Sequence, residues 1–426
     1  MRGGHAGADD AGRLRADALG RGERVVLYLV LLLASLAYNF SFILVDYVRP
    51  FLVSDLGMTL QQTALLYAAQ GAGVIAGSFL MPVLVSRWGS RRVLLGAAVA
   101  LAAATALNLA ASDFAAWAVL RFCVGNALAG SYVASTTMLA NFFPPRVRGR
   151  LLTANMAMFS IALLAAGSIG AAAGAGGWRA LVWVAALAPV AVALLTLLAL
   201  PDDRRYAVYA DEDVSAETDV ARGRWSEMLT GRRLYLTLAC LLLAGLNFSG
   251  YQFYSGFITT YLLTVRGFDA TLTGLFVTVD GIGTLCGSLL WGYVADRHGR
   301  RVNAGGFALA AVFIGLFLLA PTSVLLLCVL EFGYAVCLSA ANCWAAYFAE
   351  LFPVRLRPMG TSLFHGGHVI SLLAPYVVAT VSRSQPLAVG MALAPVTFLL
   401  AAALWWTLPE TLRSSPRYRG FRAEAP

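Results

Sequence analysis

Long apolar runs recur along the whole sequence, and short breaks rich in Arg, Gly or Pro separate them. Each run is long enough for the roughly 20 residues that cross a bilayer as an α-helix. Only 12% of the residues are charged, whereas charged residues make up about a quarter of a typical soluble domain. The chain is therefore expected to be a polytopic membrane protein, and a water-soluble enzyme is excluded.

The limits of the apolar runs predict an all-α membrane protein with twelve transmembrane helices. One six-helix half over 25–200 and another over 233–408 are expected, with a polar linker at 201–232 and tails at 1–24 and 409–426. The expected spans are 25–49, 60–85, 93–111, 115–142, 151–173, 180–200, 233–264, 272–295, 302–320, 324–349, 361–381 and 386–408.

The positions of the arginines indicate the orientation of the chain. It contains 31 Arg, of which 26 lie in the tails and in the loops on the side of the termini. Cytoplasmic segments of membrane proteins carry such an excess of positive charge. Both termini are therefore expected in the cytoplasm, and the net charge of +9 reflects this bias rather than nucleic-acid binding. The Ala- and Arg-rich composition suggests a bacterial inner membrane.

The chain contains no Lys, and this absence excludes several chemistries. Without Lys there is no P-loop Gly-Lys pair for ATP phosphates and no Schiff base, so ATP-driven pumping by this chain alone is excluded. The six Cys form no Cys-x-x-Cys pair and no metal-ligand spacing with His. No Gly-x-Ser-x-Gly motif occurs either. We expect no metal, no cofactor and no enzymatic activity.

The chain matches itself at an offset of about 210 residues. Asn39 corresponds to Asn247, Gln70 to Asp280, and Arg121 to Glu331. Because both halves have the same orientation, they are parallel repeats, a plan in which substrate binds between the halves near the middle of the membrane. The repeat predicts a transporter that works by alternating access.

A loop in the second half, Gly292-Tyr-Val-Ala-Asp296-Arg297-His-Gly299-Arg300-Arg301, resembles the G-x-x-x-D-R-x-G-R-R signature of the major facilitator superfamily. The corresponding loop of the first half has Pro82 for the first Gly and Ser86 for the Asp. The resemblance implies that the loop closes the cytoplasmic side while the outside is open. The expected gating residues are Gly292, Asp296, Arg297, Gly299, Arg300 and Arg301, with Asp296 near Arg148 and Arg150.

Other segments also resemble this superfamily. Arg121-x-x-x-Gly125 is similar to its R-x-x-x-G motif, and the segments around Glu350 and around Pro409-Glu410 resemble its metabolite, aromatic-acid and sugar symporter branches. The resemblance covers essentially the whole chain. The fifth span of the chain lacks the Gly-Pro element that is typical of drug antiporters, and this absence favours uptake over efflux.

Five ionisable side chains are expected inside the membrane, where each costs about 2.5 to 3.5 kcal/mol on insertion scales. They are Asp46, Arg49, Arg121, Asp280 and Glu331. We interpret Asp46 as the proton acceptor, with Arg121 pairing alternately with it and with substrate. The alternative is a static ion pair that fixes two helices. Asp280 and Glu331 serve coupling or substrate binding, or else are polar contacts between helices.

Polar side chains share helix faces with these charges. The His pair at 365 and 368 fits interhelical hydrogen bonds better than proton coupling. The resemblance implies that the first, fourth, seventh and tenth spans line the path. The candidate substrate contacts are Arg121, Arg49, Asn39, Gln70, Asn247, Tyr251 and Tyr254, with His365 and His368 as weaker candidates.

We therefore interpret the chain as a monomeric secondary transporter in the lipid bilayer. The predicted activity is proton-coupled uptake of a small organic anion such as a carboxylate, with Arg121 holding the anionic group. Proton-driven efflux of a cationic or amphipathic compound is the alternative within transport. A non-transporting membrane sensor is an alternative of another class, but neither the tails nor the linker are long enough for a signalling domain.

Overall fold

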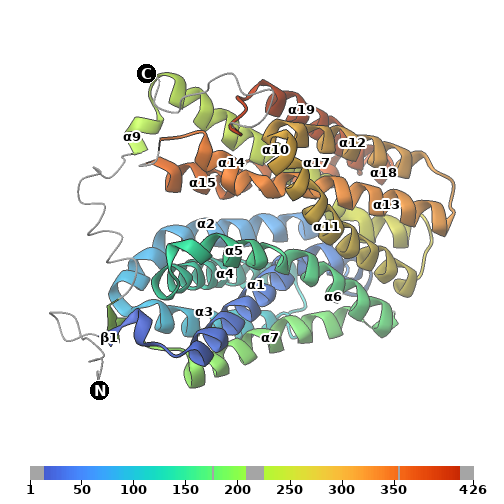
Figure 1. Cartoon of the computed structure of the whole chain (residues 1–426). Helices are drawn as coiled ribbons and strands as arrows, with labels where there is room; N and C mark the ends of the chain where they lie inside the picture. Colours follow the sequence, from blue (N-terminus) through green and yellow to red (C-terminus); the bar gives the residue numbers. More distant parts are fainter. Residues whose placement is uncertain (1–13, 175–176, 208–224, 354–355, 413–426) are drawn as a thin grey trace, which may run out of the picture. The chain divides into compact units, whose positions relative to one another are not determined.

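The computed structural model describes residues 14–174, 177–207, 225–353 and 356–412. In this part of the chain, twelve helical stretches are long and apolar enough to cross a membrane (Figure 1). A helix pairs its backbone N–H and C=O groups internally, as the bilayer interior requires of a spanning segment. The predicted all-α membrane fold is confirmed for the described residues.

The first half follows the predicted spans, with two differences. The predicted span 151–173 is formed by two helices, Pro145–Met156 and Met158–Ala173. The first helix continues to Leu56 through Pro50, although the apolar run ends at residue 49, so Asp46 and Arg49 lie well inside it. The elements are β1 (Leu14–Arg15), η1 (Ala16–Ala18), α1 (Arg21–Leu56), α2 (Leu60–Trp88), α3 (Ser90–Leu107), α4 (Phe114–Phe142), α5 (Pro145–Met156), α6 (Met158–Ala173), α7 (Trp178–Ala199), η3 (Asp203–Arg205) and β2 (Tyr206–Ala207), which pairs in parallel with β1.

In the second half, the last three predicted spans are each made of several shorter helices. Backbone hydrogen bonds continue at these junctions, for example from the N–H of Gly367 to the carbonyl oxygen of Leu363 and from the N–H of Ala392 to that of Ala388, so each span stays helical overall. The elements are α9 (Trp225–Met228), α10 (Gly231–Thr264), α11 (Ala270–His298), η4 (Arg300–Asn303), α12 (Ala304–Leu319), α13 (Val324–Leu338), η5 (Ser339–Cys343), α14 (Trp344–Glu350), α15 (Arg357–Gly366), α16 (His368–Ser371), α17 (Ala374–Val381), α18 (Leu387–Met391) and α19 (Leu393–Thr407).

The helices pack as two compact units. The first contains Met1–Leu44, Ala69–Ala162 and Arg179–Val220, and the second contains Val45–Ala68, Leu163–Trp178 and Ala221–Pro426. The ends of α1 and α6 and the start of α2 thus pack with the second half of the chain. In α6 a glycine permits this contact, because a Cβ on Gly167 would lie 2.4 Å from the backbone nitrogen of Thr278 in α11.

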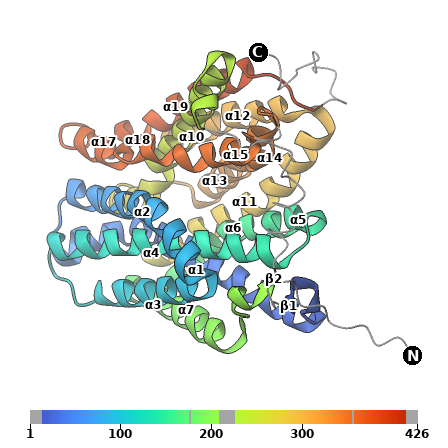
Figure 2. The ribbon, with the colours of Figure 1, turned by 90° about the vertical axis from the view of Figure 1, so that its left-hand side faces the viewer.

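Equivalent glycines bring equivalent helices together in the two units. In the first unit, α2 approaches α4 so closely that a Cβ on Gly73 would lie 2.0 Å from the carbonyl oxygen of Phe122. In the second unit, a Cβ on Gly283 of α11 would lie 3.0 Å from the carbonyl oxygen of Phe332 in α13. Helices α3 and α4 also run side by side (Figure 2). The sequence repeat is therefore a repeat of helix packing, as small residues permit in membranes.

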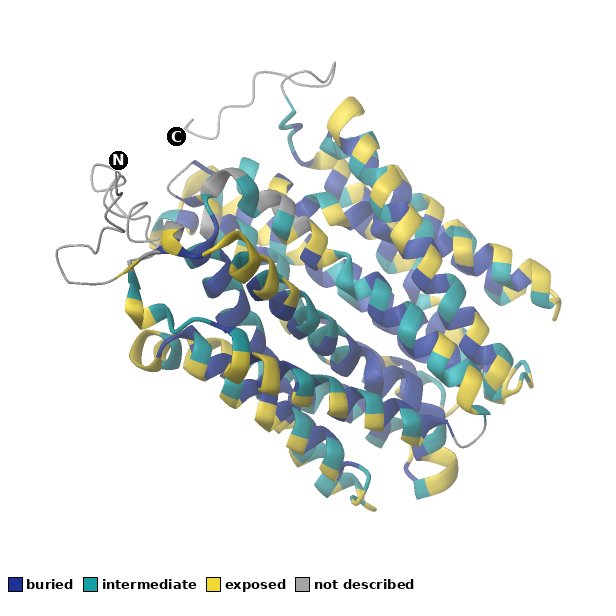
Figure 3. Cartoon of the chain, turned by 60° about the horizontal axis from the view of Figure 1, so that its bottom comes forward, coloured by how far each residue is buried: buried dark blue, intermediate teal, exposed yellow. Residues whose placement is uncertain are grey.

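The helices of each unit bury one face and expose the other (Figure 3). Many of the exposed side chains are large and apolar, including Leu198, Leu289, Leu319 and Leu325. On a soluble protein such a surface would favour aggregation, whereas lipid tails cover it at no cost. The polar side chains of the candidate site lie on the buried faces.

Candidate functional site

Helix α1 places Asp46 and Arg49 one turn apart in the second unit, and both side chains are buried. Their spacing of three residues puts them on one face of the helix. Arg49 Nη2 lies 3.0 Å from Asp46 Oδ1, so the two charges compensate each other. Arg49 is therefore the ion-pair partner of Asp46 within the second unit. The predicted alternation of Arg121 between Asp46 and substrate stays a prediction.

Helix α10 supplies the remaining partners of this ion pair. Gln252 Nε2 donates to Asp46 Oδ2 at 3.3 Å, and Arg49 Nη1 donates to the carbonyl oxygen of Gly256. The guanidinium carbon of Arg49 also lies 4.2 Å from the ring centre of Phe257, a cation–π distance. Both carboxylate oxygens of Asp46 are thus occupied, and the ion pair fixes α1 to α10.

A second buried polar group in the same unit contains two acids. Asp280 of α11 and Glu331 of α13 are both almost completely buried. The hydroxyl group of Tyr254 donates to Glu331 Oε2 at 2.6 Å. Asp280 Oδ1 has no hydrogen-bond partner among the described residues. Neither acid has an ion-pair partner in that part of the chain.

The tyrosines predicted on the seventh span lie beside these acids. Tyr251 and Tyr254 of α10 are buried, as is Asn247 one turn earlier. The ring of Tyr254 packs edge-on against that of Tyr334 at 4.7 Å between centres. Asn247 Oδ1 is unpaired among the described residues. The predicted face of the seventh span is therefore a buried polar face rather than a purely apolar one.

Arg121 lies in the first unit, on α4, and is completely buried. Its Nη1 donates to Gln70 Oε1 at 3.4 Å and its Nε to Asn108 Oδ1 at 3.5 Å, and both acceptors are neutral amides. Nη2 has no hydrogen-bond partner among the described residues. No carboxylate of the described part of this unit forms an ion pair with Arg121, so its positive charge is uncompensated there.

The other predicted contacts in the first unit occupy the same region of the helices. Gln70 Nε2 donates to the carbonyl oxygen of Phe42 at 3.1 Å, which orients Gln70 Oε1 towards Arg121. Asn39 donates to the carbonyl oxygen of Ser35 at 2.8 Å, one turn back along α1. Gln70 thus positions the arginine, while Asn39 is bound to its own helix.

The two histidines lie in an aromatic cluster between α10 and the broken helix α15–α16. The ring of His368 stacks on Phe248 with 3.6 Å between centres. His365 lies 6.3 Å from His368 and 5.3 Å from Phe364. These ring contacts support a packing role for both histidines.

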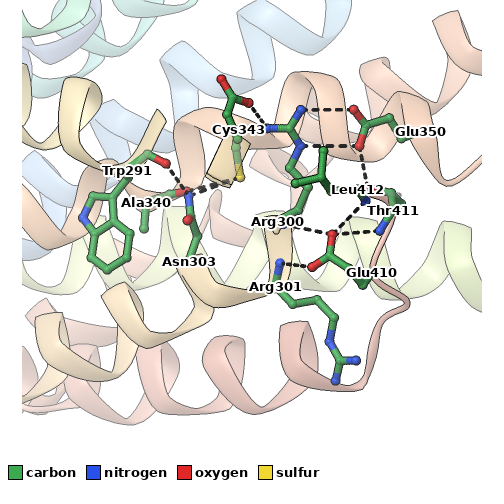
Figure 4. A network of polar contacts seen from close by, with 11 residues as sticks. Trp291, Arg300, Arg301, Asn303, Ala340, Cys343, Glu350, Glu410, Thr411 and Leu412 are labelled. Atoms are coloured by element: carbon green, nitrogen blue, oxygen red, sulfur yellow. Dashed lines mark hydrogen bonds and ion pairs between the residues drawn. The ribbon is translucent and has the colours of Figure 1, made fainter. Parts of the chain in front are cut away.

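The predicted gating loop is fixed within the second unit by two acids from later in the chain (Figure 4). Glu350, at the end of α14, binds Arg300, whose Nη2 lies 3.2 Å from Glu350 Oε1. The buried carboxylate of Glu410 accepts the backbone N–H groups of Arg300 and Arg301, each at 3.0 Å. Gly299, with φ of +105°, makes the turn between α11 and η4.

The side chains at the surface of this loop have local partners. Asp296 Oδ1 lies 2.6 Å from Arg300 Nη1, and Asp296 is 74% exposed. Arg297 donates to the hydroxyl group of Tyr293 at 2.6 Å. Gly292 lies one turn before Asp296 on α11. The predicted approach of Asp296 to Arg148 and Arg150 stays a prediction.

The equivalent loop of the first half has the same kind of anchor but lacks the acid at its surface. Asp203 Oδ2 accepts the backbone N–H of Ser90 at 2.7 Å, as Glu410 does for the second loop. Gly89 makes the turn with φ of +84°. Ser86 replaces Asp296, and its hydroxyl group donates to the carbonyl oxygen of Val83 in its own helix. The two loops thus share an anchor and differ in charge.

Several residues of the site were not singled out from the sequence. Gln252, Asn108 and Tyr334 carry no charge, so a search for charged side chains in apolar segments does not find them. Tyr334 follows Glu331 by three residues on α13, and this spacing was the available signal. No group of three or more metal-ligating side chains occurs among the described residues.

Comparisons with known proteins agree with this architecture. A model of the Major Facilitator Superfamily matches residues 28–346 and 258–425. The sialic acid transporter NanX of Escherichia coli (strain K12) is 25% identical over 366 residues, covering 84% of this chain and 88% of that protein. The cis,cis-muconate transport protein of Acinetobacter baylyi is 22% identical over 391 residues, covering 89% and 92%. A crystal structure of a D-xylose-proton symporter aligns with a TM-score of 0.71 at 17% identity, covering 91% of this chain and 98% of that chain.

Proposed function

The chain belongs to the major facilitator superfamily, whose members are membrane transporters and not enzymes, and from this premise we propose that it imports a small organic anion together with protons. The two curated relatives described above are named for sialic acid and for cis,cis-muconate, both of which are carboxylic acids. A carboxylate is accordingly the proposed anionic group of the substrate.

The uncompensated guanidinium group of Arg121 is the observation that carries this proposal. A buried charge without a partner is expensive, and in membranes such residues mark substrate or ion pathways. Arg121 has two weak contacts to neutral amides and an unpaired Nη2 among the described residues. A substrate carboxylate would supply the missing negative charge and could accept two parallel hydrogen bonds from the planar guanidinium group. Gln70 and Asn108 would hold the arginine in position.

We assign driving protons to the buried carboxyl groups and gating to the loop around Asp296. Burial disfavours a charged carboxylate and a neighbouring arginine favours it, so a change of surroundings alters proton binding. Asp46, Asp280 and Glu331 are the candidates. The alternating pairing of Arg121 with Asp46 stays a prediction outside this proposal. We place both termini in the cytoplasm of a bacterial inner membrane and treat the transporter as a monomer.

Efflux of a cation is the second candidate, and one observation favours it. Asp280 and Glu331 have no ion pair with an arginine among the described residues. Two such carboxyl groups would suit a cationic substrate as well as protons.

The test of the proposed function is transport by the purified protein in liposomes. With acid outside, the protein is expected to accumulate a carboxylate above its equilibrium level, and a protonophore should abolish the gradient. A panel of carboxylates, sugars and cationic dyes identifies the substrate class. Movement of the dyes against their gradient, with no accumulation of any carboxylate, would establish the efflux alternative instead.

The gating role of Asp296 predicts a change in conformation with little change in stability. Asp296 is exposed, so Asp296→Asn should reduce the free energy of unfolding by only about 0 to 1 kcal/mol. It should increase cytoplasmic labelling of a Cys introduced between the halves, because the closed cytoplasmic side is weakened. The matched variant Glu410→Gln removes an acceptor for buried N–H groups and should cost about 1 to 3 kcal/mol. Unchanged labelling in Asp296→Asn would reduce the loop to a structural anchor.

A further inference from the structure

The internal repeat assigns opposite charges to equivalent positions. Gln70 and Arg121 of the first unit correspond to Asp280 and Glu331 of the second, at the same offset of 210 residues. In the first unit these positions hold a cation and a neutral amide that contact each other at 3.4 Å. In the second unit they hold two acids. Because the helix packing is equivalent, the second unit places two acids where the first unit places an arginine and an amide.

The packing of α11 on α13 brings the two acids together. Asp280 lies one turn before Gly283, and Glu331 directly precedes Phe332, and these neighbours mark the close approach of the two helices. Asp280 acts electrostatically on Glu331. Tyr254 occupies one oxygen of Glu331, while Asp280 Oδ1 stays unpaired among the described residues. The acids form one buried pair with a free acceptor oxygen.

No positive group compensates this pair in the described part of the second unit. Arg49 already forms an ion pair with Asp46 and donates a hydrogen bond to the carbonyl oxygen of Gly256. Helices α6, α12 and α19 contribute no titratable side chain. The other titratable groups near the pair carry no positive charge. One is Asp46, whose charge Arg49 balances. The rest are hydroxyl and thiol groups: Tyr47 of α1, Tyr251 and Tyr254 of α10, and Cys328 and Tyr334 of α13.

Two neighbouring carboxylates cannot both stay ionised in a buried site without a cation, and such pairs share a proton. Asp46 differs, because Arg49 balances its charge and Gln252 occupies its second oxygen. The candidate acids therefore differ in their surroundings: Asp46 has a positive partner, whereas Asp280 and Glu331 have none among the described residues.

We propose that Asp280 and Glu331 together form the proton-binding site of the transporter, and that the Asp46–Arg49 ion pair has a structural role. This inference rests on the proposed function and names the site of its coupling ion. The pair takes a proton from water on the acidic side, forming a carboxyl O–H bond. When the site opens to the other side, that bond breaks and the proton passes to water. No metal, electron donor or further co-reactant takes part.

The test uses the full-length protein in liposomes and a carboxylate that the wild-type protein exchanges. Asp280→Asn and Glu331→Gln should each reduce proton-driven accumulation by at least about tenfold, while exchange of labelled for unlabelled substrate persists because it requires no net proton transfer. Asp269→Asn is the matched control, since it makes the same chemical change at the exposed start of α11, where Asn also caps a helix. Undiminished accumulation in both pair variants would overturn the proposal.

Two further measurements keep the proposal testable if a variant transports poorly. The infrared carbonyl band of a protonated carboxyl group is expected in the wild-type protein at neutral pH and should be absent from the Asp280→Asn/Glu331→Gln double variant. An equal band in both proteins would overturn the assignment. Accumulation driven by a sodium gradient without a pH gradient would also overturn it. A wild-type protein that accumulates no anion, yet has the band, would refute the proposed function and leave the protonated pair supported.

Discussion

Arg121→Lys is expected to reduce transport of the organic anion by at least about 100-fold, because it removes the second hydrogen bond of a bidentate contact. A charge-assisted hydrogen bond is worth about 1.5 to 3 kcal/mol, and the repositioning of a buried cation adds to the loss. An ammonium group keeps the charge but cannot reproduce the planar fork. Lys also lacks the Nε–H and Nη1–H groups that Asn108 and Gln70 now accept.

The measurement is exchange of labelled substrate in liposomes together with the substrate-induced rise in melting temperature. Arg383→Lys is the matched control, because Arg383 is exposed in the turn after α17. We expect this control to behave like the wild-type protein. Binding and exchange at wild-type levels in Arg121→Lys would remove Arg121 from the anion site.

The second large effect concerns stability. Arg49→Gln leaves Asp46 buried without its positive partner, and breaking a buried ion pair from one side costs about 3 to 5 kcal/mol. The variant also loses the contacts to Gly256 and Phe257. We expect a clear fall in the melting temperature of the detergent-solubilised protein.

The double variant Asp46→Asn/Arg49→Gln separates charge from packing. Replacement of both charges by amides removes the unpaired carboxylate, so the double variant should recover most of the stability that Arg49→Gln loses. A structural ion pair predicts this recovery. If the double variant were as unstable as Arg49→Gln, the contacts of Arg49 with α10 would outweigh its charge.

The twelve spans could be predicted from hydropathy, because the bilayer imposes a length and a polarity that the sequence displays directly. The ends and interruptions of helices could not. Pro50 reads as a helix terminator, yet α1 continues to Leu56. The sequence around Gly366 and Gly367 contains flexible residues, but nothing local distinguishes a break from a close approach of two helices.

The ionisable residues of the site could be identified from the sequence, because charged side chains are rare in apolar segments. The partner of each ionisable residue could not be identified in this way. The interpretation of Asp46 relied on depth in the membrane and did not identify Arg49, three residues away, as its ion-pair partner within the second unit. Neutral partners such as Gln252 and Asn108 carry no charge signal. The sequence repeat was the most informative pattern, because it shows that Arg121 and Glu331 occupy equivalent positions in the two halves before any distance is known.

The isolated charge of Arg121 has an electrical consequence. A membrane potential acts on net charge with about 2.3 kcal/mol per elementary charge for each 100 mV. In the empty transporter the site carries the guanidinium charge, whereas with a monovalent carboxylate bound it is neutral. The proposed driving proton adds one positive charge to the loaded step. One proton with each monovalent carboxylate would therefore carry no net charge across the membrane, and accumulation should then follow the pH gradient rather than the voltage.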